Sequence, residues 1–141
     1  MGEARDVMNR LTDTLFSKDL DALTKIYAAD AVMETPDQGS VSGSDAIVSY
    51  LGGMMAAFPD ASYEGRHEHE SGNTAIDEGY FVGTQTGPLE TPTGESVPAT
   101  GKRVRMRAID VAVVEGGRVT SHRLYFDQME FMEQLGLAPQ P

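Results

Sequence analysis

Two carboxylates and an arginine near the end of the sequence, Asp110, Asp127 and Arg123, have spacings that could bring them onto one face of a β-hairpin. The glycine pair Gly116-Gly117 predicts a two-residue turn, because such turns need positive φ angles that glycine adopts at little cost. The resulting register places Asp110 opposite Arg123, with Asp127 on the same face. A shift of one residue in the turn would instead place Asp110 opposite His122.

These residue types suit general acid–base chemistry on a carbonyl compound. A carboxylate in an apolar cavity has its pKa raised towards the working pH by desolvation, so Asp127 is the candidate base. We expect Asp110 to neutralise and orient Arg123, whose guanidinium could stabilise an enolate oxygen, and Tyr125 to donate a hydrogen bond to the same oxygen. In the alternative interpretation, Asp110 and Arg123 form a cross-strand salt bridge and Asp127 caps the final helix.

Several apolar and aromatic residues are candidates to line a pocket beside these groups, because methionine in particular adapts to irregular shapes. The same residues could equally be ordinary core. His67 and His69 share one face of a strand, but the sequence positions no third metal ligand, so we expect no metal and place His67 beside the pocket mouth or at the surface. The expected ligand-binding residues are Phe16, Met33, Tyr50, Met54, His67, Met106 and Tyr125.

Length and composition limit the fold and the partners. The 141 residues predict one domain, 1–141, and the net charge of −11 makes nucleic acid and membrane surfaces unfavourable partners. The absence of cysteine excludes thiolate chemistry, and the charged N-terminus predicts neither a signal peptide nor a membrane span. A cytoplasmic location is expected.

Hydrophobic periodicity predicts helices first and strands afterwards. Apolar residues at helical spacing predict two short helices, the second of them after the N-cap residue Asp19, before a brief strand at 31–35. A third helix is predicted to start at Gly43-Ser44 and to end near Phe58. Alternation then predicts strands near 61–70, 74–84, 103–114 and 118–127, followed by a short helix after Asp127. Mid-strand, Asp77 or Glu78 must point inward. The polar 83–102 stretch is either a functional lid or a plain hairpin connection. The expected architecture is α+β, with helices that cover one face of an antiparallel sheet.

Short runs distributed along the chain carry a resemblance to a known family. They are Tyr27-Ala28-Ala29-Asp30-Ala31-Val32, Gly43 with Ala46-Ile47, Phe58-Pro59-Asp60, Gly83-Thr84-Gln85-Thr86-Gly87, Pro98-Ala99-Thr100-Gly101, Tyr125-Phe126-Asp127 and Gln134-Leu135-Gly136-Leu137. In order and spacing, the chain resembles the SnoaL-like polyketide cyclases of the NTF2-like superfamily. One departure is Gln85, where many relatives have histidine.

The resemblance implies a cone-shaped cavity, or pocket, between a curved antiparallel sheet and the N-terminal helices. It also implies no metal or organic cofactor and an acid/base aspartate at the position of Asp127. It further implies a homodimer that packs through the outer sheet face and a role in secondary metabolism. The adaptable methionine side chains suit an apolar small-molecule substrate, polycyclic or polyene. Among the inward candidates of the second strand the resemblance favours Asp77. The expected function is a cofactor-independent cyclase that closes a ring by aldol or related chemistry. The fold also hosts isomerases, epoxide hydrolases, cycloaddition-type cyclases and non-catalytic ligand-binding proteins, and these alternatives stay open.

Overall fold

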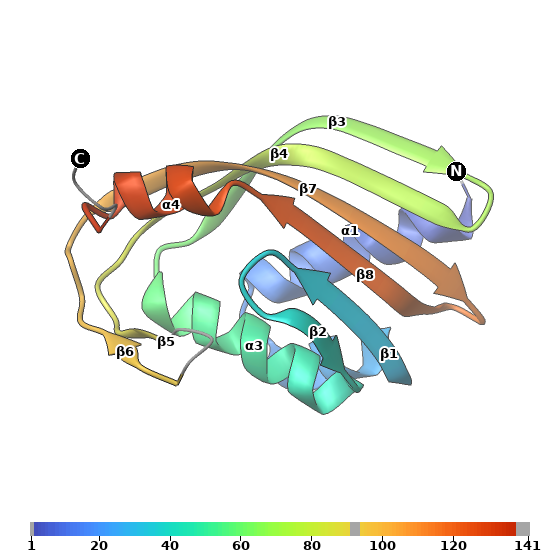
Figure 1. Cartoon of the computed structure of the whole chain (residues 1–141). Helices are drawn as coiled ribbons and strands as arrows, with labels where there is room; N and C mark the ends of the chain where they lie inside the picture. Colours follow the sequence, from blue (N-terminus) through green and yellow to red (C-terminus); the bar gives the residue numbers. More distant parts are fainter. Residues whose placement is uncertain (1, 91–93, 138–141) are drawn as a thin grey trace.

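A curved six-stranded sheet arches over the N-terminal helices in the computed structural model, which describes residues 2–90 and 94–137 (Figure 1). The helices are α1 (Glu3–Phe16), α2 (Leu20–Ile26), α3 (Ser44–Ala57) and α4 (Gln128–Gln134). In spatial order, the sheet contains β2 (Gly39–Ser42), β1 (Tyr27–Thr35), β8 (Arg118–Phe126), β7 (Arg103–Glu115), β4 (Thr74–Thr84) and β3 (Ser62–Ser71). A small separate sheet pairs β5 (Leu89–Glu90) with β6 (Ser96–Val97). The predicted α+β cone is confirmed.

The prediction of an antiparallel sheet is wrong for one pair of strands. β1 runs parallel to β8, whereas the pairings of β1 with β2, β3 with β4, β4 with β7 and β7 with β8 are antiparallel. Hairpins are visible in a sequence because a turn joins the two strands, but β1 and β8 are separated by most of the chain. The sheet is therefore mixed, and β1 closes the cone beside the strand that carries His122.

The ends of the helices follow the capping residues. The Asp19 side chain accepts a hydrogen bond from the Ala22 amide at 3.1 Å, which starts α2 where the sequence predicts it. Gly43 precedes α3 with a positive φ of 94°, and Phe58 is the C-cap residue of that helix. In the part of the chain that the structure describes, no helix is long and apolar enough to cross a membrane.

The stretch 83–102 is anchored by the buried amide of Gln85. Its Nε2 donates to the carbonyl oxygens of Gly87 and Pro98, at 3.1 and 3.3 Å. Its Oε1 accepts from the amide and the hydroxyl of Thr100, at 3.1 and 2.8 Å. Gln85 therefore has a structural role that explains its complete burial. The tip of this stretch, 91–93, lies outside the described residues.

A β-bulge in β8 changes the predicted register of the last hairpin. Glu115 pairs with Arg118 as the glycine turn predicts, but Thr120 is then skipped and Val113 pairs with Ser121. The Thr120 hydroxyl donates to the Val113 carbonyl oxygen at 3.3 Å. Beyond the bulge, Asp110 lies opposite Leu124, so the predicted pairing of Asp110 with Arg123 is wrong. The one-residue shift considered as the alternative is also wrong.

The bulge decides which β8 side chains enter the cone. An extra residue on one strand reverses the alternation beyond it relative to the partner strand. His122, Leu124 and Phe126 consequently share the inner face with Asp110, while Arg123 and Tyr125 face outward.

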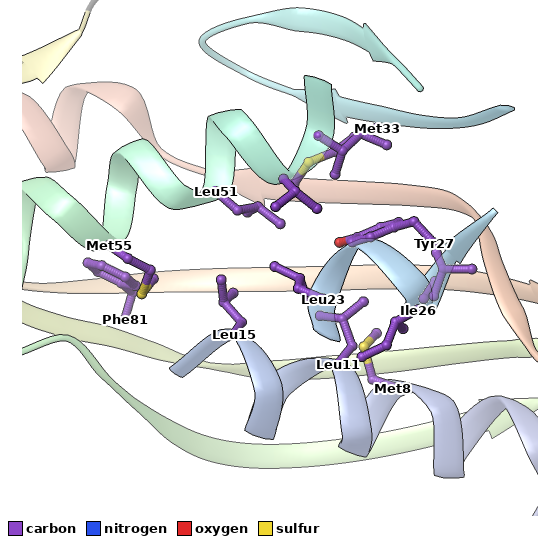
Figure 2. Close-up of a cluster of buried hydrophobic side chains, with 14 of the residues drawn as sticks. Met8, Leu11, Leu15, Leu23, Ile26, Tyr27, Met33, Leu51, Met55 and Phe81 are labelled. Atoms are coloured by element: carbon purple, nitrogen blue, oxygen red, sulfur yellow. The ribbon is translucent and has the colours of Figure 1, made fainter. Parts of the chain in front are cut away.

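The core fills the space between the helices and the inner face of the sheet. Figure 2 shows side chains from α1, α2 and α3 packed against one another and against residues of β1 and β4. The labelled residues are each at most 8% exposed: Met8, Leu11, Leu15, Leu23, Ile26, Tyr27, Met33, Leu51, Met55 and Phe81. This packing fixes the distance at which α1 and α3 face the sheet.

Gly79 allows a close approach within the inner layer. It pairs with Gly65 across β3 and β4. A Cβ atom at position 79 would collide with the Glu64 carbonyl oxygen and would lie 2.6 Å from the Tyr63 hydroxyl oxygen. Backbone cannot move aside as a flexible side chain can, so this position requires glycine.

We expect Gly79→Ala to lower the free energy of unfolding by about 2 kcal/mol or more, because overpacking against backbone forces strand displacement. Gly53→Ala is the matched control, since Gly53 lies within α3 and, apart from the backbone of that helix and the adjacent residues, no atom of the described chain lies within 4 Å of its Cβ position. That substitution should stabilise by about 0.5–1 kcal/mol through helix propensity. Urea unfolding of both variants measures the difference, and equal effects would contradict the close approach.

Candidate active site

A cavity of about 80 Å³ lies between the inner face of the sheet and helices α1 and α3. Its wall is apolar apart from five polar residues, Thr12, Tyr50, Tyr63, Asp110 and His122. An apolar pocket with a few convergent polar groups is the usual form of a small-molecule site. The remaining wall residues are Met8, Leu11, Leu15, Phe16, Leu51, Met54, Met55, Phe81, Met106, Ala108, Leu124 and Phe126.

Asp110, His122 and Tyr27 form a hydrogen-bonded chain that ends at the cavity. His122 Nε2 lies 2.6 Å from Asp110 Oδ1, and His122 Nδ1 lies 2.7 Å from the Tyr27 hydroxyl. Burial, with a smaller contribution from the Asp110 charge, raises the pKa of Tyr27 well above its ordinary value, so Tyr27 keeps its proton. In neutral His122, Tyr27 therefore donates to Nδ1 and the Nε2 hydrogen is directed to Asp110.

The exposure of these groups indicates their roles. Tyr27 and His122 are 1% and 2% exposed, whereas the Asp110 side chain keeps 24% of its surface accessible. His122 binds one carboxylate oxygen, and no described residue donates a hydrogen bond to the other, Oδ2. Asp110 is thus held in one orientation with an oxygen available to exchange a proton.

A second inward carboxylate, Asp77, lies directly opposite Asp110 on the neighbouring strand. Arg5 of α1 pairs with it at 2.6 Å, and both side chains are almost fully buried. Burial raises the pKa of Asp77, Arg5 opposes that rise, and the Asp110 charge adds to it. Arg5 also lies 3.3 Å from Glu68, so one arginine joins α1 to the β3–β4 hairpin. The expectation that Asp77 points inward is confirmed, although it is not part of the cavity wall.

Four of the expected ligand-binding residues are placed in the cavity wall: Phe16, Tyr50, Met54 and Met106. Their contact with a ligand stays a prediction. Met33 is completely buried in the core and is not a wall residue, because alternation along β1 points it at the helices. The Tyr50 hydroxyl donates to Asp37 at 2.9 Å, which fixes this tyrosine between the cavity and the β1–β2 turn.

The predicted inward position of Asp127 is wrong. Asp127 is exposed and is the N-cap of α4, where its Oδ1 accepts from the amides of Met129 and Glu130 at 2.9 and 3.2 Å. The capping interpretation describes its geometry correctly. The side chain is not in the wall of the interior cavity, and its expected acid/base role stays a prediction.

Other expected site residues lie on the outer side of the sheet. His67, Tyr125 and Asp127 border an open groove of about 760 Å³ on that side, together with Tyr80 and charged side chains. Arg123 also faces outward beyond the bulge. The two predicted catalytic partners of Asp110 are therefore separated from it by the sheet.

Three functional candidates were not recognised from the sequence. Tyr27 belongs to a run that carries the family resemblance, but nothing in that run indicates contact with His122. His122 becomes inward only through the bulge, and Tyr63 carries no motif. Within residues 2–90 and 94–137, no three His, Cys, Asp or Glu side chains are grouped as a metal site requires.

Comparisons with known proteins agree with this architecture. The family model described as SnoaL-like domain matches residues 8–122. Among curated proteins, no sequence matches the chain. A solved structure of a proposed SnoaL-like polyketide cyclase from Jannaschia sp. CCS1 is 18% identical, with a TM-score of 0.84 over 98% of this chain and 94% of that one.

Two streptomycete structures are also similar. IdmH of Streptomyces antibioticus, a proposed polyketide cyclase, is 22% identical with a TM-score of 0.78, over 96% of this chain and 99% of that one. AclR of Streptomyces galilaeus, a proposed hydroxylase, is 22% identical with a TM-score of 0.80, over 98% of this chain and 87% of that one. At these identities the structures show a shared fold.

We expect Arg5→Met to destabilise the protein by about 3 kcal/mol at pH 7, because it leaves Asp77 buried without a cation. Asp77 has its folded-state pKa raised, so between its ordinary pKa, near 4, and the raised value the native state binds more protons than the unfolded state. The free energy of unfolding therefore falls as the pH rises through that window, and the destabilisation caused by Arg5→Met should be smaller at pH 5 than at pH 7.

Urea unfolding at several pH values tests this expectation. The control is the double variant Arg5→Met/Asp77→Asn, in which the additional pH dependence should disappear. A destabilisation by Arg5→Met that is the same at pH 5 and pH 7 would contradict the assignment to Asp77.

Proposed function

We propose that this chain, which belongs to the SnoaL-like domain family, is a cofactor-independent cyclase that closes a ring in a polyketide-like carbonyl compound. The observation that carries the proposal is the Asp110 carboxylate, held by His122 at the wall of an apolar cavity. The family and the fold suggest a cyclase, and the site supplies a group that can take and return a proton.

The reaction needs one proton acceptor that later acts as a donor. Asp110 Oδ2 removes a proton from a carbon next to a carbonyl, and the electron pair of that C–H bond moves into the enolate. The enolate carbon then bonds to a second carbonyl carbon of the same molecule, whose oxygen becomes an alkoxide. Asp110 returns its proton to that alkoxide, so the carboxylate is regenerated.

His122 and Tyr27 are positioning residues in this proposal. The Nε2 hydrogen of His122 holds Asp110 Oδ1, and the Tyr27 hydroxyl holds the His122 ring. Because both are buried, the carboxylate cannot rotate freely, and Oδ2 is preorganised for proton transfer. Asp127 is the base expected from the sequence, but its Oδ1 accepts hydrogen bonds from two helix amides on the outer side.

The cavity must enlarge to accept a polyketide. At about 80 Å³ it is smaller than the 300–1,000 Å³ typical of ligand sites. Four of its wall residues are methionines, Met8, Met54, Met55 and Met106. Methionine changes rotamer readily, so displacement of these side chains is a low-cost way to open the pocket.

The expected homodimer belongs to the same proposal. Ile109 and Tyr125 are 39% and 51% exposed on the outer sheet face, which supports an interface there. That arrangement would leave the inner cavity of each copy free for substrate.

Substitution of Asp110 by asparagine should reduce turnover of a poly-β-ketone ester by at least about 100-fold, because acid–base catalysis typically contributes 10²–10⁴. Asparagine can still accept from His122, so ligand binding should persist. Asp127→Asn is the matched control, since asparagine also caps helices, and it should change turnover by less than about two-fold. Product absorbance measures turnover, and calorimetry measures binding.

The pair of variants separates the hypotheses. Loss of turnover in Asp127→Asn with full turnover in Asp110→Asn would return the base to Asp127. Full turnover in both would end the acid–base proposal. Binding without turnover by the unchanged protein across a series of such esters would identify a ligand-binding protein.

A further inference from the structure

The Tyr63 hydroxyl is buried in the cavity wall and has no hydrogen-bond partner among the described residues. The other tyrosine of the wall, Tyr50, donates to Asp37. Leaving a buried hydroxyl without a partner costs about 1–3 kcal/mol, so such a group in a folded protein needs an explanation. The position of this hydroxyl at the cavity, where a ligand could be bound, suggests one.

The backbone is shaped to hold the Tyr63 ring in this position. Gly65 and Gly79 pair across β3 and β4, and Ala108 follows Gly79 on the next strand. A Cβ at Gly65 would lie 3.4 Å from Tyr63 Cε2, and one at Gly79 would lie 2.6 Å from its hydroxyl oxygen. The ring therefore lies across two glycines. On α1, the centroid of the Phe16 ring lies 6.1 Å from that of the Tyr63 ring, which limits the movement of Tyr63 towards the helix.

The charges around Tyr63 keep it a donor. Burial raises its pKa most, and the carboxylates of Asp77 and Asp110 raise it further, followed by Glu68, while Arg5 opposes them. Deprotonation would place a third negative charge beside the two inward carboxylates. The hydroxyl thus keeps its proton at neutral pH and can donate a hydrogen bond to a neutral oxygen or to one that develops negative charge.

We propose that Tyr63 donates a hydrogen bond to the substrate carbonyl oxygen whose neighbouring carbon gives up its proton to Asp110. The inference rests on the proposed function for the identity of the base, and it names the recognised group, a carbonyl oxygen that becomes an enolate oxygen. As the C–H electron pair moves towards this oxygen, the hydrogen bond strengthens and lowers the barrier. Tyr63 keeps its proton throughout, and only Asp110 exchanges one.

A small ketone that can accept but not donate a hydrogen bond isolates this contact. The probe is cyclopentanone labelled with ¹³C at the carbonyl, and methylenecyclopentane is the isosteric control without an acceptor. In the unchanged protein, we expect the infrared carbonyl stretch of the bound ketone to move to lower frequency than in hydrocarbon solvent. Tyr63→Phe should abolish that shift and weaken ketone binding about 10-fold, the value of one hydrogen bond, without weakening the binding of methylenecyclopentane.

The Tyr63→Phe variant keeps the aromatic ring across Gly65 and Gly79, and near-ultraviolet circular dichroism verifies the fold. Tyr80→Phe is the matched control: Tyr80 lies on the same strand pair but faces outward beneath Arg105, so it should leave the carbonyl shift unchanged. An unshifted carbonyl in the unchanged protein, or a shift that persists in Tyr63→Phe, overturns the inference. A shift that depends on Tyr63 in a protein that turns over no poly-β-ketone ester supports the contact and overturns only the cyclase proposal.

Discussion

The pairing of β7 with β8 through the bulge at Thr120 is the constraint on which the interior of this protein depends. One skipped residue turns His122 inward and directs Arg123 outward. Without it, the same strand would present an arginine to Asp110, and a full positive charge would hold that carboxylate ionised. With it, Asp110 faces the His122 imidazole, whose other nitrogen is occupied by Tyr27. A local irregularity of the backbone thus selects the partner of the carboxylate in the cavity wall.

The carboxylates of Asp77 and Asp110 face each other across adjacent strands and would repel. Each has a different partner. Asp77 receives the guanidinium of Arg5, which neutralises it with a permanent charge and docks α1 on the hairpin. Asp110 receives a hydrogen bond from His122 and keeps an oxygen at the cavity. The first carboxylate is structural because its charge is matched and enclosed. In the second, one oxygen is fixed by His122, and the proposed proton exchange falls to the other.

The sequence predicted the elements well and the site less well, for a physical reason. Helix starts at Asp19 and Gly43 and the turn at Gly116-Gly117 depend on nearby residues, so local chemistry reveals them. The bulge depends on Thr120, a residue with no bulge signature, and the parallel pairing of β1 with β8 depends on packing between distant segments. The strand pairing counted from the Gly116-Gly117 turn is correct up to Val119 and wrong beyond it. The placement of Asp127 failed with it, since the chain reaches the cap of α4 on the outer side.

The outer groove and the inner cavity differ greatly in volume, and volume alone would favour the outer groove over the proposed site. The outer groove is larger, but its arginines already have partners: Arg105 pairs with Glu64 and stacks on Tyr80, and Arg107 pairs with Glu130. Its charges are exposed and screened by water, so they exert little control over a proton. The inner cavity is small, yet it combines an oriented carboxylate with a tyrosine hydroxyl that has no partner in the described chain. Because electrostatic interactions strengthen where water is excluded, the inside of the cone is the more favourable environment for the proposed proton transfer.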